Sequence, residues 1–381
     1  MTLEAMKATF PYFGYDTYAL KGFVEDLGAE VVLPPQTSKR TLEIGVEHSP
    51  ELICLPFKVT LGNFIEALDR GADTVFMAAG ARKCRFGYYH YLQEKALQKL
   101  RPGRSLIAVS QYSPYELVFR LIPSMFGVSP TRVIRAVWLF FEKSFLTEEF
   151  RHLLNRSRAV DFDRAERLRR PSLDLIERAR TRTEIRRART TLHGWFAGNG
   201  RKPEVRIGLV GEIYFMIEQF ANQEIEKELA KLGAEVLFQR SLFHHLLHLL
   251  RADPGFYRSQ HLARRYLKEC PGGEAIRTVG EAIHFAEKDK VDGIVHVFPF
   301  TCMPENMALE ALQQLSIDSG VPVLSLSFDE HTSGTGILTR LEAFVDLVKR
   351  RRSRREQKSD VRLQNAEVKK ADTNRGIENA G

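Results

Sequence analysis

A five-residue stretch, Leu27-Gly28-Ala29-Glu30-Val31, recurs later in the chain as Leu232-Gly233-Ala234-Glu235-Val236. Each copy follows an amphipathic stretch, residues 18–26 and 217–231, which in turn follows a short apolar run ending in a glycine turn, residues 8–14 and 205–211. This order predicts a strand, a turn, a helix, a glycine stop and a second strand in each copy. The sequence therefore indicates two similar halves.

Apolar runs alternate with amphipathic stretches in both halves. Strands are expected at residues 8–13, 30–33, 52–55, 74–78 and 105–110, and again at 205–210, 235–238, 293–298 and 321–325. Because strands that alternate with helices form parallel sheets, the pattern predicts an α/β fold with two pseudo-repeated, Rossmann-like parallel-sheet domains. Ligands of such sheets bind outside the carboxyl ends of the strands.

The middle and the end of the chain differ from these halves. Long helical patterns without strand signals occupy residues 131–145, 147–155, 164–169 and 172–190. We therefore expect an N-terminal Rossmann-like domain over residues 1–115, an arginine-rich helical insert over 116–200 and a C-terminal Rossmann-like domain over 201–350, ending in a helix at 338–350. Residues 351–381 are charged and almost without large apolar residues, which predicts a disordered tail.

Composition limits the class of protein. The chain has 381 residues, 44% of them hydrophobic, which supports real cores. It has no apolar run of 18 residues, and its start lacks the basic-then-apolar order of a signal peptide, so we expect a cytosolic protein without a membrane span. Four cysteines in such a protein favour metal or redox chemistry over disulfide bonds.

The net charge of +8 is concentrated in one segment, because residues 151–190 contain thirteen arginines and only six acidic residues. A basic surface that is confined to one segment does not favour nucleic acid as the partner of the whole protein. The arginine-rich helices could dock the phosphates of coenzyme A, a partner subunit or RNA, or they could form a solvated face laced with ion pairs. Aromatic residues are sparse there, which argues against single-stranded RNA.

The four cysteines form two pairs at matching places in the two halves, Cys54 with Cys84 and Cys270 with Cys302. Three of them follow predicted strands at strand-to-helix turns, whereas Cys270 precedes a Pro-Gly-Gly loop. Because the carboxyl ends of parallel strands meet at one edge of a sheet, these three are expected to converge. We predict that Cys54, Cys84 and Cys302 bind a metal centre, with Cys270 as a possible fourth ligand.

The surroundings of the cysteines indicate which centre they bind. The basic residues beside Cys84 would favour its thiolate form if they lie near the sulfur, and the helix that starts after Cys302 would stabilise an anion there. Short Cys-x-x-Cys pairs are missing, and a dispersed, all-sulfur ligand set suits an iron–sulfur cluster better than zinc. Three ligands would leave one iron open to a substrate, whereas four would suit electron transfer alone.

Charged residues near the cysteines are further candidates. Glu212 directly follows the first strand of the second half and Glu305 follows Cys302, and each could act in catalysis or cap a helix. The basic residues could hold an anionic substrate, tune the cluster or be ordinary solvated cations; they are Lys58, Arg82 and Arg85.

Two other segments carry weaker signals. His244 and His248 have the i, i+4 spacing that could bind zinc, but the glutamate of a zinc-protease motif is missing and an amphipathic helix is the simpler interpretation. The polar loop over residues 327–336 contains glycines, but their spacing matches neither a Walker loop nor a dinucleotide fingerprint. No ATP-binding motif is visible, so we do not expect this chain to be an ATPase itself.

Four blocks of the sequence resemble the 2-hydroxyacyl-CoA dehydratase D-component family, and most closely its CoA-activase-related branch. The blocks are Cys84-Arg85-Phe86-Gly87-Tyr88-Tyr89, Gly211-Glu212-Ile213-Tyr214, residues 295–305 with Pro299-Phe300-Thr301-Cys302-Met303-Pro304-Glu305, and Leu338-Thr339-Arg340-Leu341-Glu342-Ala343-Phe344. The resemblance covers residues 8–350. It implies two Rossmann-like domains and an oxygen-sensitive 4Fe-4S cluster between them, bound by cysteines that match Cys54, Cys84 and Cys302.

The resemblance also implies a separate ATPase, an activase, that injects one low-potential electron. The dehydratases use this electron to form a ketyl radical of a 2-hydroxyacyl-CoA and expel water. The leading hypothesis is therefore an iron–sulfur protein that acts on an acyl thioester, a hydro-lyase typical of anaerobic metabolism, with a homologous subunit or a second copy as a further partner. The alternatives are a non-catalytic electron carrier that serves a separate ATPase, and a zinc-stabilised binding protein.

Overall fold

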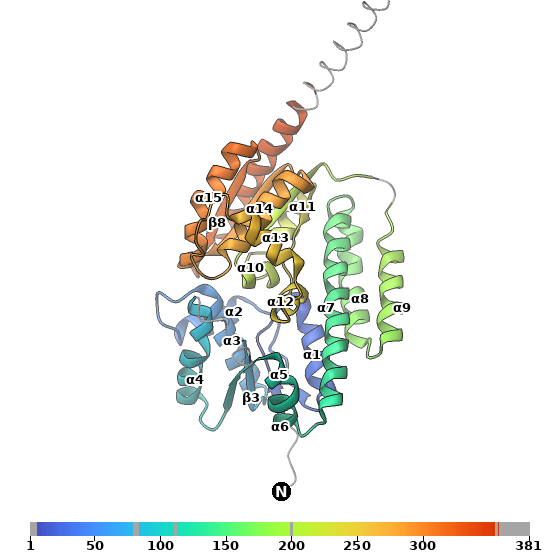
Figure 1. Ribbon diagram of the computed structural model, residues 1–381, viewed down its shortest axis with the longest axis vertical. Helices are drawn as coiled ribbons and strands as arrows, with labels where there is room; N and C mark the ends of the chain where they lie inside the picture. The colour runs from blue at the N-terminus through green and yellow to red at the C-terminus, as the bar shows by residue number, and fades with distance from the viewer. Residues whose placement is uncertain (1–5, 79–83, 110–112, 199–200, 355–356, 358–381) are drawn as a thin grey trace, which may run out of the picture.

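The computed structural model of the chain describes residues 6–78, 84–109, 113–198, 201–354 and 357. Two α/β domains lie one above the other, and long helices from the middle of the chain stand beside both of them (Figure 1). Each domain is built on one four-stranded parallel sheet. The predicted α/β fold with two Rossmann-like domains and a helical insert is therefore confirmed.

The first sheet contains β1 (Lys7–Thr9), β2 (Glu30–Val31), β3 (Thr74–Met77) and β4 (Ser105–Ala108), in the order β2-β1-β3-β4. All its pairs are parallel, with Ala8 opposite Val31 and Thr74. The helices of this domain are α1 (Thr17–Asp26), α2 (Lys39–Glu47), α3 (Leu55–Asp69) and α4 (Tyr89–Leu100).

The second sheet repeats this topology. Its strands are β5 (Val205–Gly211), β6 (Ala234–Leu237), β7 (Gly293–Pro299) and β8 (Val323–Phe328), in the order β6-β5-β7-β8. The recurring sequence stretch plays the same part in both halves, because Gly28 and Gly233 have φ angles of 100° and 80° at the end of a helix and lead into β2 and β6. Glycine adopts this left-handed conformation without the steric cost that a Cβ would bring.

The helices of the second domain connect its strands. They are α10 (Ile213–Ile217), α11 (Ile225–Lys231), α12 (Leu242–Leu249), α13 (Pro254–Ala263), α14 (Ala275–His284) with the π-helical turn η4 (Phe285–Asp289), and α15 (Met303–Ser319). Residues 334–354 form a further helix that begins before the predicted residue 338 and continues into the segment for which we expected disorder. Most of that predicted tail, residues 358–381, lies outside the described residues.

The segment between the sheets is helical. A short run of α5 (Pro114–Glu116), η3 (Leu117–Leu121) and α6 (Ile122–Phe126) precedes α7 (Pro130–Arg158), α8 (Phe162–Arg178) and α9 (Arg182–Trp195). Two predicted breaks are wrong. We expected a break between residues 145 and 147, but α7 continues through the buried Leu146. We also expected a break between residues 169 and 172, but α8 continues past Pro171. The break lies instead where Thr181 and Glu184 form a capping box that starts α9.

One strand prediction is wrong for a reason that matters to the site. Residues 52–55 do not form a strand, because α3 begins at Leu55 with Pro56 in its first turn. Proline is well suited to that position, where the backbone needs no N–H donor. The residue before this turn, Cys54, is the N-cap of α3.

The two domains pack directly on each other. Leu55 and Val59 of α3 belong to the same apolar core as Leu209 and Tyr214 of the second domain. The Tyr214 hydroxyl donates a hydrogen bond to the Tyr12 carbonyl at 3.3 Å. Helix α3 therefore packs against the apolar cores of both domains.

Lys58 of α3 contributes a polar contact between the domains. Its ammonium group is 2% exposed, forms an ion pair with Glu330 of the second domain and donates to the Glu51 carbonyl at 2.9 Å. A buried cation is tolerated because these acceptors replace water.

In the insert, ion pairs engage many of the arginines. Arg158 binds Glu166, Arg189 binds Glu149, and the buried pair of Arg151 and Glu226 joins α7 to α11. Among the described residues, no single helix is long and apolar enough to cross a membrane, although the bent pair Leu117–Phe126 and Pro130–Arg158, at 106°, meets the criteria of length and composition.

Candidate functional site

Residues from both domains line a cavity of about 200 Å³. Cys54 and Cys84 of the first domain and Cys302 of the second line it together. Cys54 is buried, whereas Cys84 and Cys302 are half-buried, so the cavity reaches the surface on their side. The structure therefore brings together the three cysteines that the sequence singled out.

Each of the three cysteines is the N-cap of a helical segment. Cys54 precedes α3, Cys302 precedes α15, and Cys84 precedes the 3₁₀ turn Arg85–Tyr88, which leads directly into α4. Free N–H groups and the positive end of the helix dipole are found at such positions, and both stabilise a thiolate or an anionic cluster. The sequence carries a signal for two of these caps, because proline follows two residues after Cys54 and again after Cys302.

Burial has the largest effect on the pKa values of the Cys84 and Cys302 thiols. Burial, followed by the carboxylates of Glu305 and Glu212, raises the pKa of Cys302 far above its usual range. Burial also raises the pKa of Cys84, although the N–H groups of Phe86 and Gly87 donate hydrogen bonds that oppose the shift. Two of its three basic neighbours, Arg82 and Lys83, lie outside the described residues, so the effect of basic residues near the sulfur on the pKa of Cys84 stays a prediction.

A soft metal centre fits these residues. Three thiol groups face one cavity, and backbone N–H groups are directed at the sulfurs of Cys84 and Cys302. A buried thiol is costly to ionise unless positive charge lies beside it, and bound iron supplies such charge. Among the described residues, no group of three or more His, Cys, Asp or Glu side chains is close enough to hold a single metal ion.

Glu212 reaches the same cavity. It is the N-cap of α10, and its Oε2 atom accepts hydrogen bonds from the N–H groups of Tyr214 and Phe215 at 2.9 and 3.2 Å. Burial nevertheless raises the pKa of this carboxyl group to about 8. Glu212 therefore combines the two interpretations that the sequence left open, a helix cap and a residue of the cavity wall.

Glu305 lies beside the cavity, not among its lining residues. Its side chain is fully buried; Oε1 accepts a hydrogen bond from the Thr278 hydroxyl at 3.1 Å, and Oε2 lies 3.0 Å from Nε2 of His296. His296 in turn contacts the Ser325 hydroxyl at 3.2 Å. Glu305 is thus held by a buried network behind Cys302.

The three basic candidate residues differ in where they lie relative to the cavity. Arg85 lines the cavity and joins the domains, because it donates to the carbonyl of Leu52 at 2.8 Å and to that of Thr301 at 3.2 Å. Lys58 is bound in its interdomain ion pair away from the cavity lining. Arg82 lies outside the described residues.

Cys270 is exposed and does not line the cavity. Its loop still approaches the site, since a Cβ added to Gly273 would lie 2.8 Å from Cγ of Pro304 and 3.7 Å from Cβ of Cys84. The φ angle of 48° at Gly273 is also one that glycine adopts readily. The Pro-Gly-Gly loop therefore forms a close-fitting edge of the site.

Sequence reasoning missed several residues of the wall, among them Tyr89. Tyr89 is buried, lines the cavity and forms a hydrogen bond with Cys54. Burial, followed by the charges of Cys54 and Glu212, raises the pKa of its hydroxyl well above the usual value. Its place five residues after Cys84, at the start of α4, is a signal that could have been used.

The histidine string forms α12, as the amphipathic interpretation predicts. His244 lies 3.0 Å from Oε2 of Glu148, which comes from α7. This contact belongs to a second polar region, which is described below.

Three of the four sequence blocks that carry the resemblance fall within a match to a known family, whereas the block that begins at Cys84 lies outside both matches. Residues 199–348 match the 2-hydroxyglutaryl-CoA dehydratase, D-component family, and residues 12–79 match a CoA enzyme activase uncharacterised domain. The resemblance predicted from the sequence is thereby confirmed. No curated protein was found to match the chain.

Proposed function

Because residues 199–348 match the 2-hydroxyglutaryl-CoA dehydratase, D-component family, we propose that the chain is an iron–sulfur protein of the 2-hydroxyacyl-CoA dehydratase type that transfers low-potential electrons. The observation that carries this proposal is the convergence of Cys54, Cys84 and Cys302 on one cavity. When bound there, a 4Fe-4S cluster supplies one-electron chemistry at low potential.

Each part of the cavity has a task in this proposal. The three sulfurs are the ligands, and the N–H groups of Phe86 and Gly87 stabilise negative charge on one of them. Apolar side chains, among them Tyr89 and Pro299, limit the access of water. Arg85 holds the two domains together at the cavity through the carbonyls of Leu52 and Thr301.

The size of the cavity favours electron transfer over binding of a whole acyl-CoA. Pockets for drug-sized ligands typically measure about 300–1,000 Å³, and this cavity of about 200 Å³ is smaller. Exposed apolar side chains adjoin its lining residues in the sequence, namely Leu52 (74% exposed) and Phe300 (62%), together with Met303 (54%), which itself lines the cavity. Such a surface suits the docking of a protein partner, and a separate ATPase that donates the electron is the partner we propose.

A second candidate function is dehydration of a 2-hydroxyacyl thioester at the same site. It is favoured by two observations, the exposure of Cys270 outside the cavity and the presence of the Glu212 carboxyl group in the wall. Three cysteine ligands leave one iron able to take a further ligand, and a carboxyl group can hydrogen-bond to the hydroxyl group that departs. The short acyl part would enter the cavity while coenzyme A stays outside.

Anaerobic purification with iron and sulfide analysis and EPR tests the proposal. We expect about four irons and four sulfides per chain, with loss of the native EPR signal in Cys54→Ser, Cys84→Ser and Cys302→Ser. Cys270→Ser is the matched control because its thiol is exposed, and it should keep both the iron content and the signal. Zinc without sulfide, or a full cluster in all three single variants, would contradict the proposal.

The two candidate functions are separated by a second measurement. If the chain is an electron carrier, the reduced protein should pass its electron to a partner without binding an acyl thioester. If it is a dehydratase, addition of a 2-hydroxyacyl-CoA to the oxidised protein, whose 4Fe-4S cluster is EPR-silent, should change the Mössbauer signal of one iron, and Glu212→Gln should slow turnover without loss of iron.

A further inference from the structure

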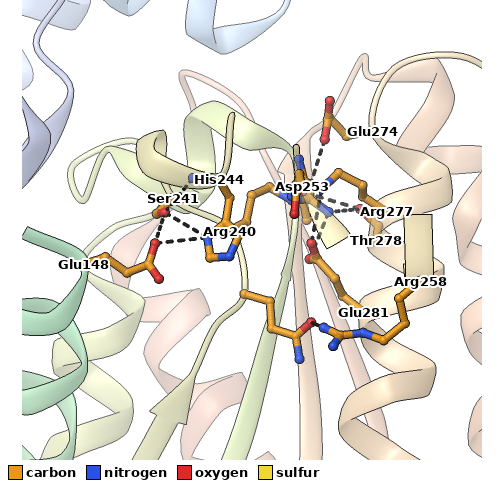
Figure 2. A network of polar contacts seen from close by, with 12 residues as sticks. Glu148, Arg240, Ser241, His244, Asp253, Arg258, Glu274, Arg277, Thr278 and Glu281 are labelled. Carbon is orange, nitrogen blue, oxygen red and sulfur yellow. Dashed lines mark hydrogen bonds and ion pairs between the residues drawn. The ribbon is translucent and has the colours of Figure 1, made fainter. Parts of the chain in front are cut away.

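A second cavity, of about 220 Å³, lies between the helical insert and the second domain. Its wall includes Glu148 and His152 of α7, Phe238 and His244 on either side of the β6–α12 turn, Arg258 of α13 and Arg277 of α14. None of these residues lines the cysteine cavity. Figure 2 shows most of the charged groups around it; Glu148, His244, Arg258 and Glu281 come from α7, α12, α13 and α14.

Arg277 is the residue that points to a ligand. Its side chain is 2% exposed, and one of its nitrogens, Nη2, binds Asp253 at 2.8 Å. The other two, Nε and Nη1, are buried without a hydrogen-bond partner, although Nε lies 3.5 Å from Glu281. A buried guanidinium with unused donors is costly unless an acceptor or water completes its hydrogen bonds.

The carboxylates of this wall are already engaged. Glu148 accepts hydrogen bonds from the Ser241 hydroxyl and lies 3.0 Å from Nδ1 of His244. Glu281 accepts from Nη2 of the fully buried Arg240 at 3.0 Å. In the wall of this cavity, as the structure describes it, two buried side-chain nitrogen or oxygen atoms lack a hydrogen-bond partner. They are Nε and Nη1 of Arg277, and both are donors.

The mouth of the cavity adds a second guanidinium. Arg258 is exposed and donates to the amide oxygen of Gln239 at 2.9 Å, which holds it beside the opening. In the same wall, the ring of His152 stacks on Phe238 at 4.1 Å, with 4° between the planes, and the guanidinium of Arg151 lies 3.9 Å from the centre of the Phe238 ring. The wall therefore combines two arginines and two histidines with the engaged carboxylates of Glu148 and Glu281.

We propose that this cavity is a binding site for a small oxyanion, a carboxylate or a phosphate monoester, whose oxygens accept hydrogen bonds from Arg277 and Arg258. Arginine is suited to this task because its planar fork matches carboxylate and phosphate oxygens. The volume admits a compact acid or a small phosphate ester and excludes a whole nucleotide or coenzyme A. A ligand bound here would join α7 of the insert to α13 and α14 of the second domain.

Isothermal titration calorimetry on the full chain, at low ionic strength, tests the site with inorganic phosphate and with succinate. Putrescine, a dication of similar size to succinate, serves as the control of opposite charge. We expect one phosphate or one succinate per chain and no binding of putrescine. Binding of phosphate alone indicates a phosphate ester as the natural ligand, and binding of succinate alone indicates a carboxylate.

Variants identify the residues that bind. Arg277→Lys keeps the charge opposite Asp253 but loses the fork, and it should weaken binding about tenfold. Arg258→Ala changes an exposed side chain, leaves the fold intact and should weaken binding at least about fivefold. The matched control is Arg264→Ala, which removes an equally exposed arginine at the end of the same helix, outside the cavity wall, and should leave the affinity unchanged.

The comparison of Arg258→Ala with Arg264→Ala tests the proposal even if Arg277→Lys folds poorly, because Arg258 and Arg264 are both exposed. Circular dichroism and thermal unfolding establish that each variant is folded before titration. The proposal is overturned if neither anion binds at millimolar concentration, or if Arg258→Ala binds the anion as tightly as Arg264→Ala does.

Discussion

The interdomain ion pair of Lys58 and Glu330 allows a sharp prediction, because its two partners differ in burial. The Lys58 ammonium group is 2% exposed and the Glu330 carboxylate is 17% exposed. Glu330→Gln leaves a buried cation without an anion, which should lower the free energy of unfolding by about 3–5 kcal/mol. Lys58→Met leaves an acceptor that water can reach and should cost only about 2 kcal/mol.

The double variant distinguishes this explanation from simple loss of contacts. Once Lys58 is methionine, the carboxylate of Glu330 has no buried charge to balance, so the double variant should cost no more than Lys58→Met alone. Equilibrium urea unfolding of the four proteins measures the cycle through the midpoint and slope of each transition. If Lys58→Met is the more destabilising single change, or if the two costs simply add, the argument from burial fails.

Two further changes test the packing and the polar network. Gly62→Ala should lower the free energy of unfolding by about 3 kcal/mol, since the added Cβ would lie 1.9 Å from the backbone oxygen of Thr41; Gly194→Ala, where nothing lies within 4 Å, is the control and should be nearly neutral or slightly stabilising. For Glu148 and His244, burial opposes both charges, but their hydrogen bond lowers the pKa of Glu148 below 4.5 and raises that of His244 above 6.5. The pair therefore stabilises fully between those values, and its contribution is lost as the pH falls through the pKa of Glu148 or rises through that of His244. The difference in Tm between the chain and Glu148→Gln should be largest near about pH 6 and small by about pH 9; a difference that does not change with pH would contradict this.

The repeated halves could be predicted because their signal is local. Each glycine stop, each apolar run and each amphipathic stretch follows from neighbouring residues, and together they predict the alternation of strands and helices that builds both parallel sheets. The convergence of the three cysteines follows only in part from the carboxyl ends of parallel strands, because Cys302 follows a strand of the second sheet whereas Cys54 follows no strand and is the N-cap of α3.

Other parts of the site could not be predicted, because they depend on contacts between distant residues. The sequence allows Lys58 to hold an anionic substrate, tune the cluster or be a solvated cation, but it binds Glu330, which lies 272 residues later in the chain. The burial that raises the pKa of Cys84 comes from tertiary packing and outweighs the hydrogen bonds from the N–H groups of Phe86 and Gly87. The strand predicted over residues 52–55 does not form, because Pro56, which is compatible with the end of a strand, is equally compatible with the first turn of a helix, which is where it lies.

The contacts of Arg85 have a consequence for how the protein opens. The guanidinium of Arg85 donates to the carbonyl of Leu52 in its own domain and to the carbonyl of Thr301 in the other, so the two domains cannot separate without loss of the hydrogen bond to Thr301. Any group that binds the three cysteine sulfurs would connect the same two domains at a second place, and binding of that group should make separation of the domains less favourable. Limited proteolysis of the connecting segment between α9 and β5 should accordingly slow once the centre is assembled.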